Sequence, residues 1–384
     1  MDSDLFESDH EAYRETARSF VQREVVPNME RWDEERCVDR ETWKKAGHAG
    51  MVGLPVPERF GGAGEPDFRY RVVLCEEIAR VGASSLQSSF STNDDIVLGY
   101  LLNLATEEQQ ERWLPGFATG ETVGAIAMSE PAAGSDLRGI TTTAVRDGDH
   151  WVLNGSKTFI TNGILADLVV LVARTAPDAG SKGYSLFVVE RDTPGFTRGR
   201  KLDKVGLQAQ DTAELFFEDV RVPVGNLLGP LGSGLPSLMQ NLPRERLAIA
   251  VAAQSSAEAA FRWTLDYVRE RRAFGKSVAE FQSVGFTLAE LRTRIEVTRA
   301  YIDRCVRAIN AGTLTAVDAA KAKWWATDMQ WKVIDTGVQL HGGYGYMKEY
   351  PIAQAFMDAR IQRIYGGTNE IMKEIISRDL VRTP

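Results

Sequence analysis

The sequence predicts an α+β protein in which a β domain stands between two helical domains. Apolar residues recur at helical spacing up to about residue 120 and again from about residue 233, whereas short runs typical of strands fill roughly 121–228. Strands and helices do not simply alternate, and no GxGxxG follows a strand, which argues against a Rossmann domain. We expect an N-terminal helical domain at 1–120, a middle β domain at 121–232 and a C-terminal helical domain at 233–384.

The N-terminal domain is expected to begin with a helix. Ser8 and Glu11 have the spacing of a capping box, and Pro27 ends the apolar periodicity that follows them. After a loop rich in proline and glycine, a second helical pattern runs from Tyr70 to Val81.

The middle domain is expected to consist of short strands separated by turns. Asp147-Gly148-Asp149 and Asn154-Gly155 have the composition of tight turns. The runs expected to form strands are Val123–Met128, Trp151–Leu153, Leu168–Ala173, Tyr184–Val189 and Leu215–Val222.

The C-terminal domain is expected to be built from long helices. Helical periodicity covers 235–271, 278–311 and 315–340. Glycine-rich loops at 342–345 and 366–367 interrupt the last part of the chain.

Composition excludes several classes of function. The chain has 384 residues and a net charge of −8, so it offers no basic surface for nucleic acid or for an anionic membrane. No apolar stretch reaches 18 residues, the length of a membrane-spanning helix.

The cysteines and the N-terminus bear on the compartment. Cys37, Cys75 and Cys305 are odd in number and far apart, so we expect neither a disulfide framework nor a metal site. The segment Met1–Ser8 is acidic and lacks the features of a secretory or mitochondrial signal. We therefore expect a reducing, cytoplasmic location.

Five segments could bind a ligand. Phe159 and Thr161 alternate onto one face of a strand, where a ring and a hydroxyl could contact a flat cofactor, and Gly366-Gly367-Thr368 leads into an apolar helix, as in anion sites. Taken alone, each feature is more typical of an ordinary turn, core residue or helix cap. The segments span 127–136, 154–162, 271–276, 339–346 and 365–370.

Glu245 is a candidate general base. It continues an apolar helical stripe that includes Leu238 and Leu242, and a carboxylate facing an apolar surface should have a raised pKa, which suits proton abstraction near neutral pH. The alternative is a structural ion pair with Arg244 or Arg246.

Taken together, these segments resemble the acyl-CoA dehydrogenase family over essentially the whole chain. Each segment has a family counterpart in the same order, as do Lys204-Val205-Gly206, Phe217–Pro223 and Asn226–Gly229. The resemblance implies two helical units around a β-barrel-like domain, an FAD cofactor and a homotetramer. It also implies a fatty acyl-CoA substrate, and electron-transfer flavoprotein as the acceptor.

The resemblance assigns roles to individual residues. It implies that Met128, Ser129, Phe159 and Thr161 contact the flavin ring, with Phe159 standing where many relatives have tryptophan, and that Ser135 lies near the pyrophosphate. The residues implied to reach a neighbouring subunit's FAD are Arg271, Phe274, Gln282, Gln339, Gly342 and Gly343, and those implied to hold its adenosine part are Thr368 and Glu370. The implied substrate site contains Asn93, Val97, Ser135, Arg246 and Tyr365.

The sequence departs from the common family pattern at Gly366. Many relatives have their catalytic glutamate there, and glycine cannot act as a base. Long-chain and isovaleryl members instead use a glutamate at the position of Glu245, and the chain resembles the long-chain type most. The resemblance therefore implies that Glu245 is the base and that the N–H of Gly366 holds the thioester carbonyl. A glutamate placed at Gly366 is expected to reach the same α carbon.

Two other functions on the same fold compete with this hypothesis. One is an oxygen-using flavoenzyme, either an acyl-CoA oxidase or a flavin monooxygenase that needs no base. The other is a flavoprotein that binds acyl-CoA without reaction. Glu245 argues against both, since a retained base is hard to explain without α-proton chemistry. The sequence does not predict the length or branching of the acyl chain.

Overall fold

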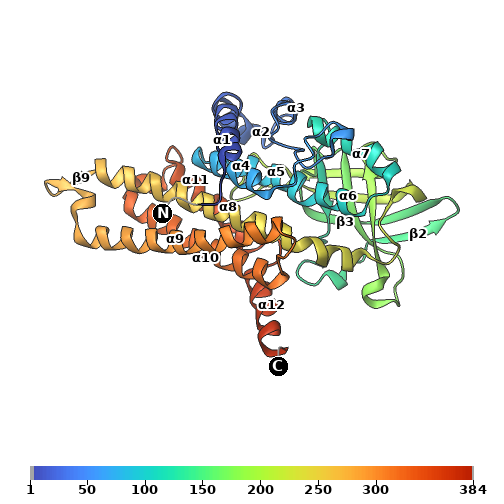
Figure 1. Ribbon diagram of the computed structural model, residues 1–384. Helices are drawn as coiled ribbons and strands as arrows, with labels where there is room; N and C mark the ends of the chain where they lie inside the picture. Colours follow the sequence, from blue (N-terminus) through green and yellow to red (C-terminus); the bar gives the residue numbers. More distant parts are fainter. Residues whose placement is uncertain (1–3, 383–384) are drawn as a thin grey trace.

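The computed structural model describes residues 4–382 and confirms the predicted fold class, with helices at both ends of the chain and a sheet between them (Figure 1). The expectation about a targeting signal concerns Met1–Ser8, of which residues 1–3 lie outside this range. Within the described residues, no helix combines the length and apolar character needed to cross a membrane.

The first helical unit contains seven α-helices. They are α1 (Ser8–Phe20), α2 (Met29–Glu35), α3 (Arg40–His48), α4 (Phe68–Arg80), α5 (Ser84–Ser91), α6 (Leu98–Leu104) and α7 (Glu107–Thr119). The capping box of α1 differs from the prediction, because Glu7 is the N-cap and His10 its partner. Between α5 and α6 the chain forms a π-helical segment, Thr92–Val97, which matters for the site below.

The middle unit is an eight-stranded sheet with the order β6-β7-β3-β2-β4-β5-β8, in which β1 pairs in parallel with β4. The strands are β1 (Gly124–Ala127), β2 (Thr143–Asp147), β3 (His150–Thr161), β4 (Leu168–Arg174), β5 (Tyr184–Glu190), β6 (Phe196–Lys201), β7 (Thr212–Pro223) and β8 (Leu227–Leu228). All five predicted strands are present, and β2, β6 and the two-residue β8 are additional.

The last unit is a bundle of long helices. Its helices are α8 (Gly234–Glu270), α9 (Gln282–Asn310), α10 (Ala316–His341), α11 (Pro351–Ala359) and α12 (Asn369–Arg382). A small hairpin of β9 (Arg272–Ala273) and β10 (Lys276–Ser277) connects α8 to α9. α8 is long enough to run from the sheet through the bundle and continues through Pro243, and α12 projects from the body (Figure 1).

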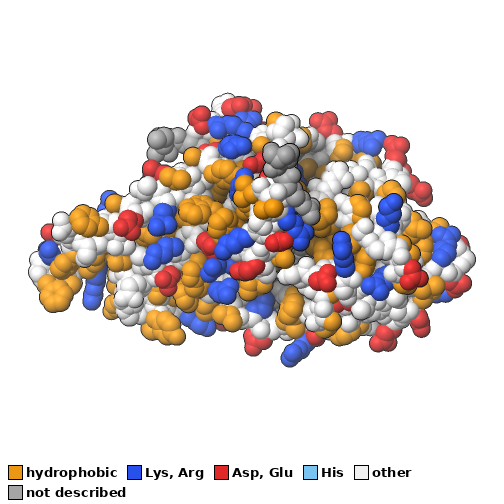
Figure 2. Space-filling model, turned by 90° about the horizontal axis from the view of Figure 1, so that it is seen from below, with side chains coloured by type: hydrophobic (Ala, Val, Ile, Leu, Met, Phe, Trp, Pro, Cys, Tyr) orange, Lys and Arg blue, Asp and Glu red, His pale blue; other side chains and the backbone are white. Residues whose placement is uncertain are grey.

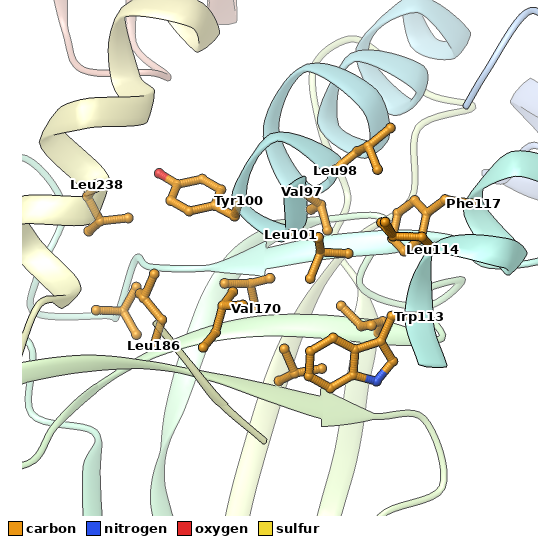
Figure 3. Close-up of a cluster of buried hydrophobic side chains, with 14 of the residues drawn as sticks. Val97, Leu98, Tyr100, Leu101, Trp113, Leu114, Phe117, Val170, Leu186 and Leu238 are labelled. Atoms are coloured by element: carbon orange, nitrogen blue, oxygen red, sulfur yellow. The ribbon is translucent and has the colours of Figure 1, made fainter. Parts of the chain in front are cut away.

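One apolar cluster joins the three units. Helices α6 and α7 pack onto β4 and β5 through residues such as Leu101, Trp113, Val170 and Leu186, and Leu238 of α8 completes the cluster (Figure 3). This packing fixes α8 beside α6, so the predicted base on α8 is held at the meeting point of helices and sheet.

Candidate active site

A cavity of about 180 Å³ lies where α4, α5, the π-helical segment, α8 and the β domain meet. Seven of the predicted site residues line it, among them Met128, Ser129, Phe159, Thr161, Glu245 and Gly366. Tyr365 lines it as well. Met128 and Gly366, which are 238 positions apart in the sequence, therefore line the same cavity.

The β wall of the cavity is fixed by a buried ion pair that sequence reasoning missed. Lys157 Nζ lies 2.9 Å from Glu130 Oε1, and the two side chains are 0% and 3% exposed. Lys157 also donates to the Met128 carbonyl at 3.1 Å, and the Thr158 N–H donates to the Ser129 carbonyl at 3.0 Å. Burial opposes ionisation of Glu130, but hydrogen bonds from Lys157 and two threonines lower its pKa to about 2. Met128 and Ser129 are thus held against β3.

Phe159 presents an uncovered ring at this wall. Its side chain is 71% exposed, and its φ of 59° lies in the left-handed region, next to a register shift between Lys157 and Ile160. A non-glycine residue in that region costs about 1–2 kcal/mol. A flat, planar ligand packed on the ring would account for both the exposure and the backbone conformation, so this wall fits the isoalloxazine of FAD.

Glu245 lies on α8 with 2% of its surface exposed. Its Oε1 accepts a hydrogen bond from Tyr100 Oη at 2.8 Å. Burial raises the pKa of Glu245 to about 7, and the Tyr100 hydrogen bond and the Arg246 charge limit that rise. A buried carboxyl group whose pKa lies near neutral pH, at the wall of a cavity, is suited to proton abstraction.

The alternative ion pairs of Glu245 do not form. The Arg244 guanidinium lies 5.0 Å from the centre of the Phe68 ring. Arg246 Nε donates to the Gly366 carbonyl at 3.3 Å, so Arg246 supports the glycine loop. The resemblance implies that Arg246 lies in the substrate site. In the structure Arg246 does not line the cavity and instead contacts the glycine loop from behind.

The glycine loop is held from its far side. Lys323 Nζ, a fully buried group, donates to the Gly367 carbonyl at 2.8 Å and to Asn369 Oδ1 at 2.9 Å. Within residues 4–382, the N–H of Gly366 donates to no protein acceptor. This N–H is therefore available to a ligand in the cavity.

The loop geometry bears on the expectation that a glutamate at Gly366 could reach the same α carbon as Glu245. The φ of Gly366 is 64°, and a Cβ at this position would lie 2.4 Å from Ile249 Cδ1. A side chain there is strained by the backbone, and the end of the Ile249 side chain must turn aside to make room for it.

Asn93 and Val97, which the resemblance implies in the substrate site, do not line this cavity. Both are fully buried in the helical core, and Asn93 Oδ1 accepts from the Gly124 N–H at 2.7 Å. Thr92 and Ile96 line the cavity instead. The wider π turn rotates the following residues relative to an α-helix, which shifts the residues facing the cavity by one position.

The remaining predicted cofactor residues lie outside this cavity. Ser135 is exposed in the loop after β1, and Thr368 and Glu370 lie at the start of α12, where Thr368 Oγ1 accepts from the Ile371 N–H at 3.3 Å. Four predicted residues line a second, open cleft of about 480 Å³ at the β9 end of the bundle, far from the sheet (Figure 1): Arg271, Gln339, Gly342 and Gly343.

Two predicted residues lie beside this second cleft. Phe274 lies in the β9–β10 turn and is 94% exposed, and Gln282 is the exposed first residue of α9. Figure 2 shows hydrophobic side chains gathered at this end of the bundle, on the left. An exposed aromatic side chain among other exposed hydrophobic side chains is suited to contact with another molecule.

Comparisons of sequence and of structure with known proteins all point to the same protein family. Models of the N-terminal, middle and C-terminal domains of acyl-CoA dehydrogenases match residues 7–121, 125–220 and 232–381. The chain is 50% identical, over 98% of its length and 87% of the relative's, to the mitochondrial long-chain specific acyl-CoA dehydrogenase of Sus scrofa. It is 40% identical to an acyl-CoA dehydrogenase of Bacillus subtilis, over 96% of this chain and 97% of that one.

Solved structures agree with these sequence relatives. The crystal structure of acyl-CoA dehydrogenase from Geobacillus kaustophilus superimposes with a TM-score of 0.96. The two chains are 49% identical, and the match covers 98% of this chain and 99% of the other.

Proposed function

Because this chain belongs to the acyl-CoA dehydrogenase family, we propose that it oxidises the single bond between the α and β carbons of a fatty acyl-CoA to the trans-2-enoyl-CoA. FAD is the proposed cofactor. When bound, FAD supplies the acceptor for the hydrogen and electron pair that leave the β carbon.

The buried carboxyl group of Glu245 is the observation that carries this proposal. Of the described residues that line the cavity, Glu245 is the only carboxylic acid, and burial holds its pKa at about 7. In the proposed reaction Glu245 takes the α proton, and the electrons of the broken C–H bond remain on the α carbon.

Gly366 has the second role. Its free N–H would donate to the thioester carbonyl, where negative charge develops as the α proton leaves. Arg246 and Lys323 hold the carbonyls of Gly366 and Gly367, which keeps this N–H in place before the substrate arrives.

The proposed flavin site uses the β wall. Phe159 would pack on the isoalloxazine ring, and Met128, Ser129 and Thr161 would contact the edge of that ring. Ser135, exposed in the loop after β1, would lie near the pyrophosphate. Thr368 and Glu370, at the α12 N-terminus, would hold the adenosine part.

We propose that the acyl tail follows the helical wall. Residues there have small side chains, among them Ala79 on α4, Ser88 and Ser91 on α5, and Ala252 on α8. Small side chains leave room between helices for an extended chain. A panel of acyl-CoA substrates from four to sixteen carbons, with branched groups included, defines the preferred length.

The second cleft supports a homotetramer. Arg271, Gln339, Gly342 and Gly343 line a separate cleft at the end of the bundle away from the sheet (Figure 1), and we propose that they cover the FAD of a neighbouring subunit. Exposed Phe274 at the same end fits this arrangement. Sedimentation of the holoprotein should give a tetramer, whereas a stable monomer with full activity would contradict this part of the proposal.

Anaerobic mixing with acyl-CoA tests the function. The flavin absorbance should bleach, enoyl-CoA should form, and electron-transfer flavoprotein should reoxidise the enzyme faster than air does. Rapid reoxidation by air alone would favour an oxygen-using flavoenzyme, and an unchanged spectrum across the whole panel would contradict the proposed reaction.

We also propose a cytoplasmic location. All three cysteines are free thiols in the structure, as expected for a reducing compartment. Fractionation of the source cells tests this placement.

A further inference from the structure

Tyr100 is a residue of α6 to which neither the motifs nor the proposed mechanism assigns a role. Its ring is fully buried in the apolar cluster between α6, the sheet and α8, beside Leu238 (Figure 3). Its hydroxyl oxygen points out of that cluster toward α8, where it donates to Glu245 Oε1 at 2.8 Å. A polar group at the end of a buried ring thus finds its partner in the proposed base, 145 residues away in sequence.

This hydrogen bond distinguishes the two oxygens of Glu245. Oε1 is engaged by Tyr100 behind the cavity wall. Within residues 4–382 no hydrogen bond engages Oε2, while the Glu245 side chain lines the cavity. Oε2 is therefore the oxygen left to receive a proton from a bound substrate.

The hydroxyl also favours one protonation state of Glu245. Burial and the Glu245 charge raise the pKa of Tyr100, so its hydroxyl remains a donor throughout the working pH range. A donor directed at a carboxylate stabilises the ionised form more than the neutral form. Tyr100 from α6 and Arg246 on α8 are the polar groups that act on the Glu245 charge, and both favour ionisation.

We propose that Tyr100 is a positioning residue for α-proton abstraction: its hydroxyl fixes Oε1 of Glu245, keeps the carboxyl group ionised in its buried place and leaves Oε2 facing the substrate. This inference rests on the proposed function. It adds a residue that acts through Glu245, without contact of its own to the reacting atoms.

The variant Tyr100→Phe tests the inference because it removes one oxygen atom and leaves the ring in its apolar cluster. A hydrogen bond to a charged group corresponds to a change of about one to two pKa units. The apparent pKa of anaerobic flavin reduction should therefore rise from near 7 by about one to two units, and its rate at pH 7 should fall about 5-fold to 50-fold. Much of the rate should return at pH 9.

Infrared difference spectroscopy gives a readout without turnover. In the resting holoenzyme, the band of the protonated Glu245 carboxyl group can be assigned by its loss in Glu245→Gln. Its titration midpoint should lie near 7 in the wild type, as the pKa of Glu245 indicates, and higher in Tyr100→Phe.

Tyr301→Phe is the matched control. Tyr301 Oη donates to Asp318 Oδ1 at 3.3 Å, so this variant also removes a tyrosine–carboxylate hydrogen bond, but one away from the cavity. Its rate profile and infrared titration should match those of the wild type.

Two outcomes would overturn the role of Tyr100. One is a Tyr100→Phe profile and titration identical to the wild type. The other is an equal loss of rate at every pH together with lower thermal stability, which is the pattern of a purely structural residue. If the wild type itself fails to reduce its flavin with any acyl-CoA, the proposed function fails, and the infrared titration still decides whether Tyr100 controls Glu245.

Discussion

Replacing Glu245 with glutamine should make the enzyme slower and, above neutral pH, more stable. The amide keeps the shape of the side chain and can still accept the Tyr100 hydrogen bond, but it cannot take a proton. Loss of a general base typically slows a reaction by about 10² to 10⁴-fold. No other carboxylic acid among the described residues lines the cavity, so we expect the upper part of that range.

The stability effect follows from the pKa of Glu245. Its rise from 4.5 to about 7 on folding corresponds to about 3 kcal/mol, at 1.36 kcal/mol per pKa unit. Between these two pH values the folded chain binds more protons than the unfolded chain, so the wild type loses stability as pH rises from 4.5 through 7. Glutamine carries no such cost. At pH 8 the variant should be more stable than the wild type by up to about 3 kcal/mol.

Two measurements on the same protein check this prediction. Anaerobic stopped-flow gives the rate of flavin reduction, and urea unfolding at pH 5.5, 7 and 8 gives the difference in stability, which should grow with pH. Glu374→Gln, at an exposed glutamate of α12, is the control and should change neither quantity. A Glu245→Gln rate within a few-fold of the wild type, or a stability difference that does not vary with pH, would refute the reasoning.

Three further predictions concern the cavity walls. Glu245→Gln combined with Gly366→Glu should recover only part of the flavin reduction rate, because the φ of 64° at Gly366 strains any side chain there; adding Ile249→Ala, which removes the Cδ1 that the new Cβ must push aside, should raise that rate further, and a double variant no faster than Glu245→Gln alone would contradict the expectation that both positions reach the α carbon. Lys157→Met should leave Glu130 buried without its cation, lowering stability by about 3–5 kcal/mol and the flavin content of the purified protein; unchanged flavin-to-protein absorbance and unfolding would argue against the role of this pair. Phe159→Ala should weaken FAD retention while the unfolding free energy of the apoprotein stays within about 1 kcal/mol, because the ring is 71% exposed; full retention of FAD during dialysis would show that the ring does not hold it.

Much of the fold could be predicted from periodicity alone. The three long helices of the bundle follow apolar repeats whose period is typical of a helix. The five strands with longer apolar runs, β1, β3, β4, β5 and β7, were also expected. β2 and β6 were missed because their residues are largely polar or basic, as in Phe196–Lys201, and they form strands by pairing with β3 and β7. Pairing partners are not visible in a local pattern.

The site residues also divide into those that a local sequence pattern predicts and those whose roles depend on partners distant in sequence. Glu245 could be proposed from its place on an apolar helical face, and Phe159 and Thr161 from strand alternation. Tyr100, Glu130 and Lys157 could not, because their roles depend on partners brought together by folding. Asn93 and Val97 were placed in the substrate site by the resemblance, and the π turn that instead turns Thr92 and Ile96 toward the cavity has no signature in the local sequence.

The pH dependence of flavin reduction tests the central claim, that buried Glu245 is the base. At low acyl-CoA concentration, the second-order rate of anaerobic reduction reports the ionisation of the free enzyme. For the wild type this rate should rise with pH and level off with an apparent pKa near 7, the value that burial gives Glu245, and in Glu245→Gln the rise should vanish. A wild-type rate that is flat from pH 5.5 to 8.5, or the same rise persisting in Glu245→Gln, would contradict the account.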